Sequence, residues 1–196
     1  MIPRRLVRTV PTRTTTEVEA FWRRARDLHP GWDHVTWRDP IDPDRFPLTA
    51  RYWRKCRNGA QRAGLIRLET LWHDGGIYID SDVELYRPLD PLLGADLFAG
   101  WESVGSLNDA VIGATPGHPA IADCIQLAIR RLPRGALHSG PKVVNDVLRA
   151  RTDVLLLPPQ CFSPYHWTER HRRHEDHQAA HPWAFGAHHW HNSHGA

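Results

Sequence analysis

The stretch GAQRAGLIRLETLWHDGGIYIDSDVELYRPLDP, residues 59–91, decides the fold of this chain. Apolar residues recur at three- and four-residue spacings from Leu65 to Trp72, with polar residues between them, which predicts an amphipathic helix. Gly75 and Gly76 then predict the end of the helix, because glycine adopts the left-handed conformation at no steric cost. The apolar run at 77–79 is typical of a buried strand, so we expect an α/β fold with a mixed sheet.

Two acids follow directly after this strand. Asp80, Ser81 and Asp82 lie where an open α/β sheet brings its strand ends to a ligand crevice, so we expect all three to face a bound substrate. Two carboxylates one residue apart are able to share a divalent cation, and hard oxygen ligands favour Mg²⁺ or Mn²⁺. The alternative is an ordinary turn, since aspartate often bonds its own backbone there.

The whole string, with the helix, the double glycine, the Ile-Tyr-Ile strand, the acid pair and the Pro-Leu-Asp-Pro end at 88–91, resembles the core motif of glycosyltransferase family 32. That family contains α-mannosyltransferases of yeast outer-chain initiation and bacterial sugar transferases of capsular-polysaccharide synthesis. The resemblance implies a GT-A type fold with a Rossmann-like mixed sheet and flanking helices. It also implies Mn²⁺- or Mg²⁺-dependent transfer of a hexose from a nucleoside diphosphate sugar to an acceptor hydroxyl, with retention of configuration.

The resemblance assigns roles to the acids and to two neighbours. Asp82 would be the main metal ligand, and Asp80 would contact the ribose, the sugar or the metal through water; both are the expected catalytic residues. Arg67 matches an arginine that faces the donor, although a structural ion pair is the alternative. Tyr78 is a further donor-site candidate, or else a core residue whose hydroxyl needs a partner.

Later in the chain, Asn108 and Asp109 match an asparagine before a small apolar strand in similar family members, so we expect them to contact the donor or acceptor. A turn-forming asparagine is the alternative. Ala63 and Gly64 depart from the family, which carries a serine-aspartate pair at these positions. Loss of that acid removes an acceptor for sugar hydroxyls, and would change the choice of sugar or weaken the enzyme.

The C-terminal segment, 165–196, is rich in histidine and ends on AHHWHNSH before its last two residues. His188, with the tryptophan at 190 and Ser193, resembles the closing motif of the family, whose final tryptophan is replaced here by His194. The resemblance predicts that this segment is a lid over the site, with His188 and His191 as metal ligands and Ser193 at the donor; an unstructured tail is the alternative. The histidines at 171–177 are expected on a solvated face.

Composition sets the outer limits. At 196 residues we expect one domain, 1–196, and a hydrophobic share of 41% is ordinary for a soluble protein. The N-terminus lacks the apolar core of a signal peptide, and three widely spaced cysteines favour free thiols, so we expect a cytoplasmic protein. A net charge of +3 is compatible with a sugar nucleotide or with peripheral association with an anionic membrane, and nucleic acid is not expected as a partner. The acceptor would be a saccharide, a lipid-linked sugar or a small molecule.

Two other function classes remain open. A metal-dependent phosphohydrolase or nucleotidyltransferase would need further convergent carboxylates, for which Glu84 and Asp109 are the candidates. A catalytically degenerate binding protein is the second class, which the departures at Gly64 and His194 encourage.

The remaining elements are read from periodicity and capping signals. Thr16 stands three residues before Glu19, a capping-box spacing that predicts a helix start at Thr16. We expect further strands at 6–10, 33–37, 96–101, 108–114 and 153–157, and further helices over about 119–132 and 141–149.

Overall fold

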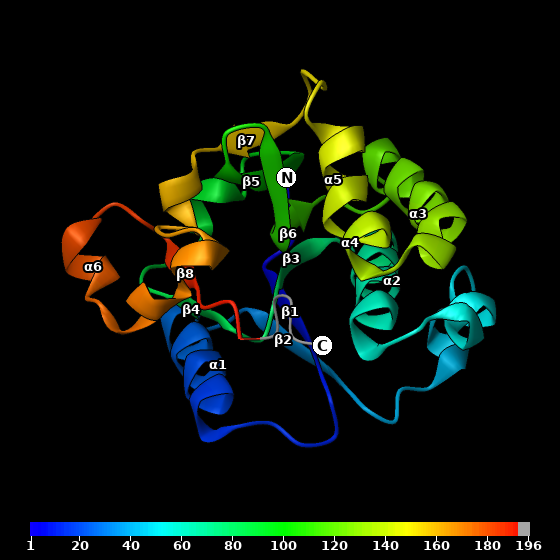
Figure 1. The fold of residues 1–196 in the computed structure, drawn as a ribbon, viewed down its shortest axis with the longest axis horizontal. Helices are drawn as coiled ribbons and strands as arrows, with labels where there is room; N and C mark the ends of the chain where they lie inside the picture. Colours follow the sequence, from blue (N-terminus) through cyan, green and yellow to red (C-terminus); the bar gives the residue numbers. More distant parts are fainter. Residues whose placement is uncertain (192–196) are drawn as a thin grey trace.

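The computed structural model describes residues 1–191, and its centre is a six-stranded mixed sheet in the order β2-β1-β3-β6-β5-β7 (Figure 1). β1 pairs in parallel with β2 and β3, β6 runs antiparallel to β3 and β5, and β7 is parallel to β5. A second sheet joins β4 to β8, two strands far apart in the sequence. The strands are β1 (Arg5–Val10), β2 (Asp33–Arg38), β3 (Gly76–Ile79), β4 (Val83–Leu85), β5 (Leu97–Ser103), β6 (Ser106–Ala114), β7 (Leu155–Leu157) and β8 (Gly186–His188).

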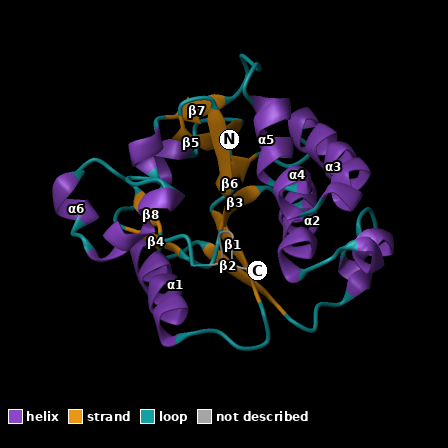
Figure 2. Ribbon diagram, viewed as in Figure 1, coloured by secondary structure: helices purple, strands orange, loops and turns teal. Residues whose placement is uncertain are grey.

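Helices cover both faces of the large sheet (Figure 2). α2 to α5 gather on one face, and α1 lies with the small sheet and α6 on the other (Figure 1). The α-helices are α1 (Thr16–Leu28), α2 (Gly59–His73), α3 (Pro119–Arg131), α4 (Ala136–Ser139), α5 (Pro141–Leu148) and α6 (His177–Ala180). The 3-10 helices are η1 (Pro43–Arg45), η2 (Ala50–Lys55), η3 (Asp90–Leu92), η4 (Leu132–Arg134), η5 (Pro159–Cys161) and η6 (Trp167–His174).

Strand alternation divides the interior into two cores. On β3, Tyr78 packs into the core beneath α2 and α3, whereas Ile77 and Ile79 pack into the core on the α1 face. Successive side chains of a strand point to opposite faces, so a strand covered on both sides is apolar throughout. The predicted buried strand at 77–79 is therefore confirmed, with Gly76 added at its start.

The sequence-based boundaries hold with two corrections. α1 begins at Thr16, but its N-cap is Thr15, whose hydroxyl accepts from the Val18 N–H, while Thr14 donates to the Glu19 carboxylate. The strand expected at 153–157 forms only at 155–157, where the chain reaches the edge beside β5. The three cysteines are free, as expected.

The spacing of apolar residues predicts that α2 is amphipathic, but the helix is buried on nearly all sides. The Glu69 side chain has no exposed surface, because the chain at 48–49 covers the face that would otherwise meet water. Its carboxylate accepts from the backbone N–H groups of Leu48 and Thr49 and from the Thr49 hydroxyl, so the buried charge is fully hydrogen-bonded. Across residues 1–191, no helix combines the length and apolar character needed to cross a bilayer.

Candidate active site

The acid pair is placed by the turn from α2 into β3. Gly75 and Gly76 have φ values of 65° and 105°, which glycine adopts readily. A Cβ atom at Gly76 would lie 2.8 Å from the carbonyl oxygen of Arg5, so the missing side chain lets β3 enter directly beside β1. After β3 ends, the Asp80 N–H donates to the carbonyl of Ala110 on β6 at 2.7 Å, which fixes the first acid against the sheet.

Asp80 faces the α2 side of the site. Arg67, one of the least exposed arginines, donates to its carboxylate at 2.5 Å and also forms an ion pair with Asp109 on β6. The guanidinium lies 4.5 Å above the ring of Tyr78, whose hydroxyl shares a 2.6 Å hydrogen bond with Thr9. Arg67 thus compensates two carboxylates at once, and a cation–π contact holds its plane.

Asp82 faces the C-terminal segment. Its carboxylate accepts from the backbone N–H of His191 at 2.9 Å, and the Nε2 atom of His188 lies 3.3 Å away. The backbone N–H of His189 donates to the Asp82 carbonyl, and β8 pairs antiparallel with β4 so that His188 stands opposite Val83. This pairing brings the C-terminal histidines to the acid pair.

The two carboxylates have opposite electrostatics. Burial, reinforced by Asp109 and Asp82, raises the pKa of Asp80 to about 6 against the opposing effect of Arg67. Burial also acts to raise the pKa of Asp82, but the charge and hydrogen bond of His188 outweigh it and hold that pKa well below its usual range. Burial acts to lower the pKa of His188, but the charge and hydrogen bond of Asp82 have the larger combined effect, so the pKa is raised overall.

Three side chains are placed to hold a metal ion. Asp80, Asp82 and His188 each offer one ligand atom, and the three atoms lie within 4.8 Å of one another. The Asn108 side-chain amide contacts the Nδ1 atom of His188 at 3.2 Å, and its oxygen accepts from the N–H of Ala110, which sets the orientation of the amide. That arrangement places the ring proton of a neutral His188 on Nε2, facing Asp82. The carboxylates fit a hard cation directly. His188 would bind through Nε2 with its ring proton on Nδ1, which requires the Asn108 amide to turn its oxygen toward Nδ1.

The structure gathers seven of the residues that the sequence proposes. They line a continuous set of contacts from α2 to β8 and are Arg67, Tyr78, Asp80, Asp82, Asn108, Asp109 and His188. Ser81 lies between the two acids at the turn after β3. The ring of His191 lies 3.4 Å from Glu17, and this residue reaches Asp82 through its backbone. Ser193 and His194 lie outside the described residues.

The C-terminal segment is packed into the protein up to 191. His189 lies between Glu84 at 3.2 Å and the hydroxyl of Tyr165 at 3.1 Å, and Phe21 of α1 stacks on its ring. His177, expected on a solvated face, is instead 2% exposed beneath the Tyr165 ring. These contacts join residues between 12 and 168 positions apart, which no periodic pattern relates, and Glu84 next to the acid motif was the one available signal.

Gly64 leaves a gap one helical turn before Arg67. It is buried, and a Cβ atom built there would have no neighbour within 4 Å outside its own helix. Gly140, just before α5, is the opposite case, since a Cβ there would lie 3.0 Å from the Asp109 carboxylate. Position 64 therefore lacks the acidic residue of the family, and no other side chain fills the space.

Comparisons with known proteins agree with this geometry. The family described as "Glycosyltransferase sugar-binding region containing DXD motif" matches residues 15–99. An inositol phosphoceramide mannosyltransferase of Schizosaccharomyces pombe is 34% identical over 134 residues, which cover 62% of this chain and 36% of that protein. A mannosyl phosphorylinositol ceramide synthase of Saccharomyces cerevisiae is 33% identical over 116 residues, covering 55% and 31%. The chain thus spans about a third of the length of these relatives.

Solved structures share the fold at low sequence identity. The glycosyltransferase GlyE of Streptococcus pneumoniae superposes with a TM-score of 0.61 at 14% identity, covering 96% of this chain and 55% of that one. The galactosyltransferase LgtC superposes with a TM-score of 0.52 at 12% identity, covering 96% and 90%. These neighbours confirm the predicted GT-A type fold. Residues 15–99 are similar to glycosyltransferases with a DXD-containing sugar-binding region, in agreement with the resemblance to family 32 in the sequence.

Proposed function

We propose that this protein transfers a hexose from a nucleoside diphosphate sugar to an acceptor hydroxyl, with a divalent cation and with retention of configuration. The observation that carries the proposal is the convergence of Asp80, Asp82 and His188 within 4.8 Å at the end of β3. A diphosphate leaving group needs positive charge beside it, and a cation held by two carboxylates supplies that charge.

The residues of the chain divide the remaining work. Asp82, already ionised, would be the main holder of Mn²⁺ or Mg²⁺, with Asp80 and His188 completing the protein's share; Mn²⁺ suits the mixed oxygen and nitrogen set. His188 would hold the ion through Nε2, which lies 3.3 Å from the Asp82 carboxylate, when that nitrogen carries no proton. Arg67 keeps Asp80 and Asp109 together despite their like charges, and so fixes the acceptor atoms available to the donor's hydroxyl groups.

The relatives narrow the substrates that we propose. Three of them are named as inositol phosphoceramide mannosyltransferases, and a lactosylceramide galactosyltransferase of Rattus norvegicus is 29% identical over 124 residues. We therefore propose GDP-mannose as the first donor to test, and a lipid-linked hydroxyl as the acceptor class.

A phosphohydrolase or nucleotidyltransferase has less support from the site. Its extra acids would be Asp109 and Glu84, but Asp109 is ion-paired with Arg67, and Glu84 is bonded to Arg24 and His189. Within residues 1–191, neither acid joins the three-residue cluster at Asp80.

A donor screen tests the proposal. The purified protein is incubated with Mn²⁺ and UDP-glucose, UDP-galactose, UDP-N-acetylglucosamine or GDP-mannose, and nucleoside diphosphate release is followed with and without acceptor. We expect release from one donor, lost in Asp82→Ala and after chelation, and kept in Asp44→Ala, which removes an exposed acid on η1. Silence with all four donors and no Mn²⁺-dependent nucleotide binding would contradict the proposal, and release of inorganic phosphate alone would favour the hydrolase.

A further inference from the structure

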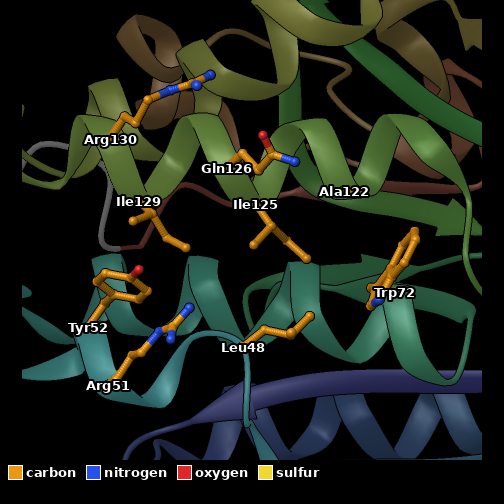
Figure 3. A pocket seen from close by; sticks show the side chains of 9 residues that line it. All are labelled: Leu48, Arg51, Tyr52, Trp72, Ala122, Ile125, Gln126, Ile129 and Arg130. Atoms are coloured by element: carbon orange, nitrogen blue, oxygen red, sulfur yellow. The ribbon is translucent and has the colours of Figure 1, made fainter.

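A groove of about 450 Å³ lies apart from the acid pair, between α3 and the segment that leads into η2 (Figure 3). It shares no residue with the site described above. Its lining consists of Leu48, Arg51, Tyr52, Trp72, Ala122, Ile125, Gln126, Ile129 and Arg130.

The groove has an apolar floor with one closed end. Ile125 and Ile129 point from α3 toward Leu48 and Tyr52 on the opposite wall, and Trp72 stands at the far end (Figure 3). A long apolar slot that stays open to solvent is costly unless an apolar ligand covers it. Its shape fits a chain of methylene groups.

Positive charge gathers at the other end. Arg51, on η2, lies beside Tyr52 at that end, and Arg130 is on the facing stretch of α3 with its side chain turned away from Arg51 (Figure 3); both residues are exposed. Within the described part of the chain, neither guanidinium has a carboxylate partner. Arg54 and Lys55 follow on η2, which contains no acidic residue. An anion at this end would gain charge-assisted hydrogen bonds from Arg51 and, once its exposed side chain turns toward the groove, from Arg130.

The wall that carries Leu48 is fixed in advance. The buried Glu69 carboxylate accepts from the N–H groups of Leu48 and Thr49, and the indole of Trp53 donates to the Thr49 hydroxyl. The groove is therefore a built feature of the fold, and its occupant has no loop to order on binding.

We propose that this groove binds one acyl chain of an anionic membrane phospholipid, with the phosphate of that lipid between Arg51 and Arg130. An apolar slot and an unpaired guanidinium pair at its mouth match the two halves of such a lipid. A second copy of this chain fits less well, because it would bring like charges together at the rim. The proposal concerns docking to an anionic membrane surface and does not depend on sugar transfer.

Vesicle flotation tests the proposal at 150 mM salt, with phosphatidylcholine vesicles and with vesicles that also contain phosphatidylglycerol. We expect binding to the anionic vesicles alone. Each arginine near such a surface contributes about 1 kcal/mol, so Arg51→Gln with Arg130→Gln should weaken binding by at least about tenfold. The matched control, Arg13→Gln with Arg23→Gln, removes the same charge from exposed positions outside the groove and should change binding by less than about twofold.

A second variant tests the acyl chain separately from charge. Ala122→Phe fills the groove without altering charge and should weaken binding to the anionic vesicles as strongly as the arginine pair does. Ile129→Gln replaces it if Ala122→Phe fails to fold by circular dichroism. Asp82→Ala should bind vesicles like the wild type. The vesicle assay therefore tests the lipid proposal even if the donor screen finds no sugar transfer.

Four outcomes would overturn the proposal. Equal losses in the control pair and the groove pair would mean non-specific charge attraction. Full competition by soluble glycerol phosphate would mean a headgroup site without an acyl chain. A dimer that Ala122→Phe dissolves would mean that the groove is an interface between copies, and no binding to anionic vesicles would exclude the lipid.

Discussion

Asp80 and Asp82 are separated by one residue on the same turn, yet each has its own set of contacts, called here the Asp80 half and the Asp82 half of the site. The Asp80 half is closed by Arg67, 13 positions earlier in the chain, and by Asp109 on the adjacent strand. The Asp82 half is closed by His188 and by the backbone of His191, 109 positions later. The first half is an ion-pair network that joins α2, the end of β3 and β6, whereas the second depends on the pairing of β4, in the middle of the chain, with β8 near its C-terminus.

The difference teaches how one motif obtains two electrostatic states. The chain turns between the two acids, where the N–H of Val83 donates to the carbonyl of Asp80, so each acid meets its own environment. Asp80 shares one guanidinium with another acid and is left with a raised pKa, whereas Asp82 has a histidine and a backbone donor to itself and has a lowered one. The two halves should therefore fail in different ways when they are broken.

Breaking the Asp80 half should have the largest effect on folding. Arg67→Met leaves Asp80 and Asp109 buried without a cation, which typically costs about 3–5 kcal/mol of unfolding free energy. For a chain of this length that corresponds to a fall of roughly 10 °C in Tm, measured by calorimetry.

Two companions make this result specific. Arg67→Met with Asp109→Asn should recover part of the loss, because one of the two stranded charges is gone. Arg151→Met, at a surface pair with Asp153, should cost at most about 1 kcal/mol. A fall no larger than that of Arg151→Met would contradict the buried network.

Breaking the Asp82 half should cost less stability but open the site. A methyl group at Gly186 would overlap the carbonyl oxygen of Glu84 on β4, so Gly186→Ala should destabilise the protein by about 2 kcal/mol and loosen the β4–β8 pair. Faster amide exchange at 186–189, measured by mass spectrometry, checks this.

The matched control is Gly64→Ala, on the Asp80 side. The site has space for a methyl group, and alanine favours a helix over glycine by about 0.5–1 kcal/mol, so this variant should be at least as stable as the wild type. The contrast between the halves is lost if both glycine variants behave alike.

Sequence reasoning reached the two halves unequally. The Asp80 half follows from local patterns, because the helix, the double glycine and the short apolar strand at 77–79 fix where the first acid must lie. The sequence did not predict that Asp109 is the second partner of Arg67. A motif match identifies a residue as a site candidate, but it does not say which charged residue lies beside it.

Hydrophobic periodicity did not predict the contacts of the Asp82 half. His188 was proposed from the closing motif, but the pairing of β8 with β4 joins two three-residue strands that no pattern identifies. The buried faces of Glu69 and His177 were missed for the same reason, because burial of a polar residue depends on the distant segment that covers it. Ser193 stays a prediction.

Removing the histidine tests the Asp82 half through its proposed ligand. His188→Gln keeps a polar group beside Asp82 but removes an imidazole ligand, and should weaken Mn²⁺ binding by about 10- to 100-fold, measured by electron paramagnetic resonance titration. His171→Gln, at an exposed histidine, should leave the affinity unchanged. If His188→Gln and His171→Gln bind Mn²⁺ with equal affinity, His188 is not a ligand and the carboxylates alone hold the ion.

The smallest effect should come from the first turn of α1, the helix that packs Phe21 against the Asp82 half. Glu19 accepts from Thr14, Arg8 and Arg38 at 2.6 to 2.8 Å. Burial acts to raise the pKa of Glu19, but these hydrogen bonds outweigh it and lower the pKa to about 2.

A folded-state pKa below the unfolded value of about 4.5 means that the ionised Glu19 stabilises the protein above that pH, and that this contribution is lost as pH falls toward 2. Its side chain is 35% exposed, so solvent screening limits the contribution to about 1 kcal/mol. Glu19→Gln should flatten the acid limb of the unfolding free energy, measured by urea titration from pH 2.5 to 7 in chelator. If Glu19→Gln also accelerates amide exchange at 186–189, then the Asp82 half depends on α1 as well as on β4; if exchange is unchanged, the β4–β8 pair holds that half by itself.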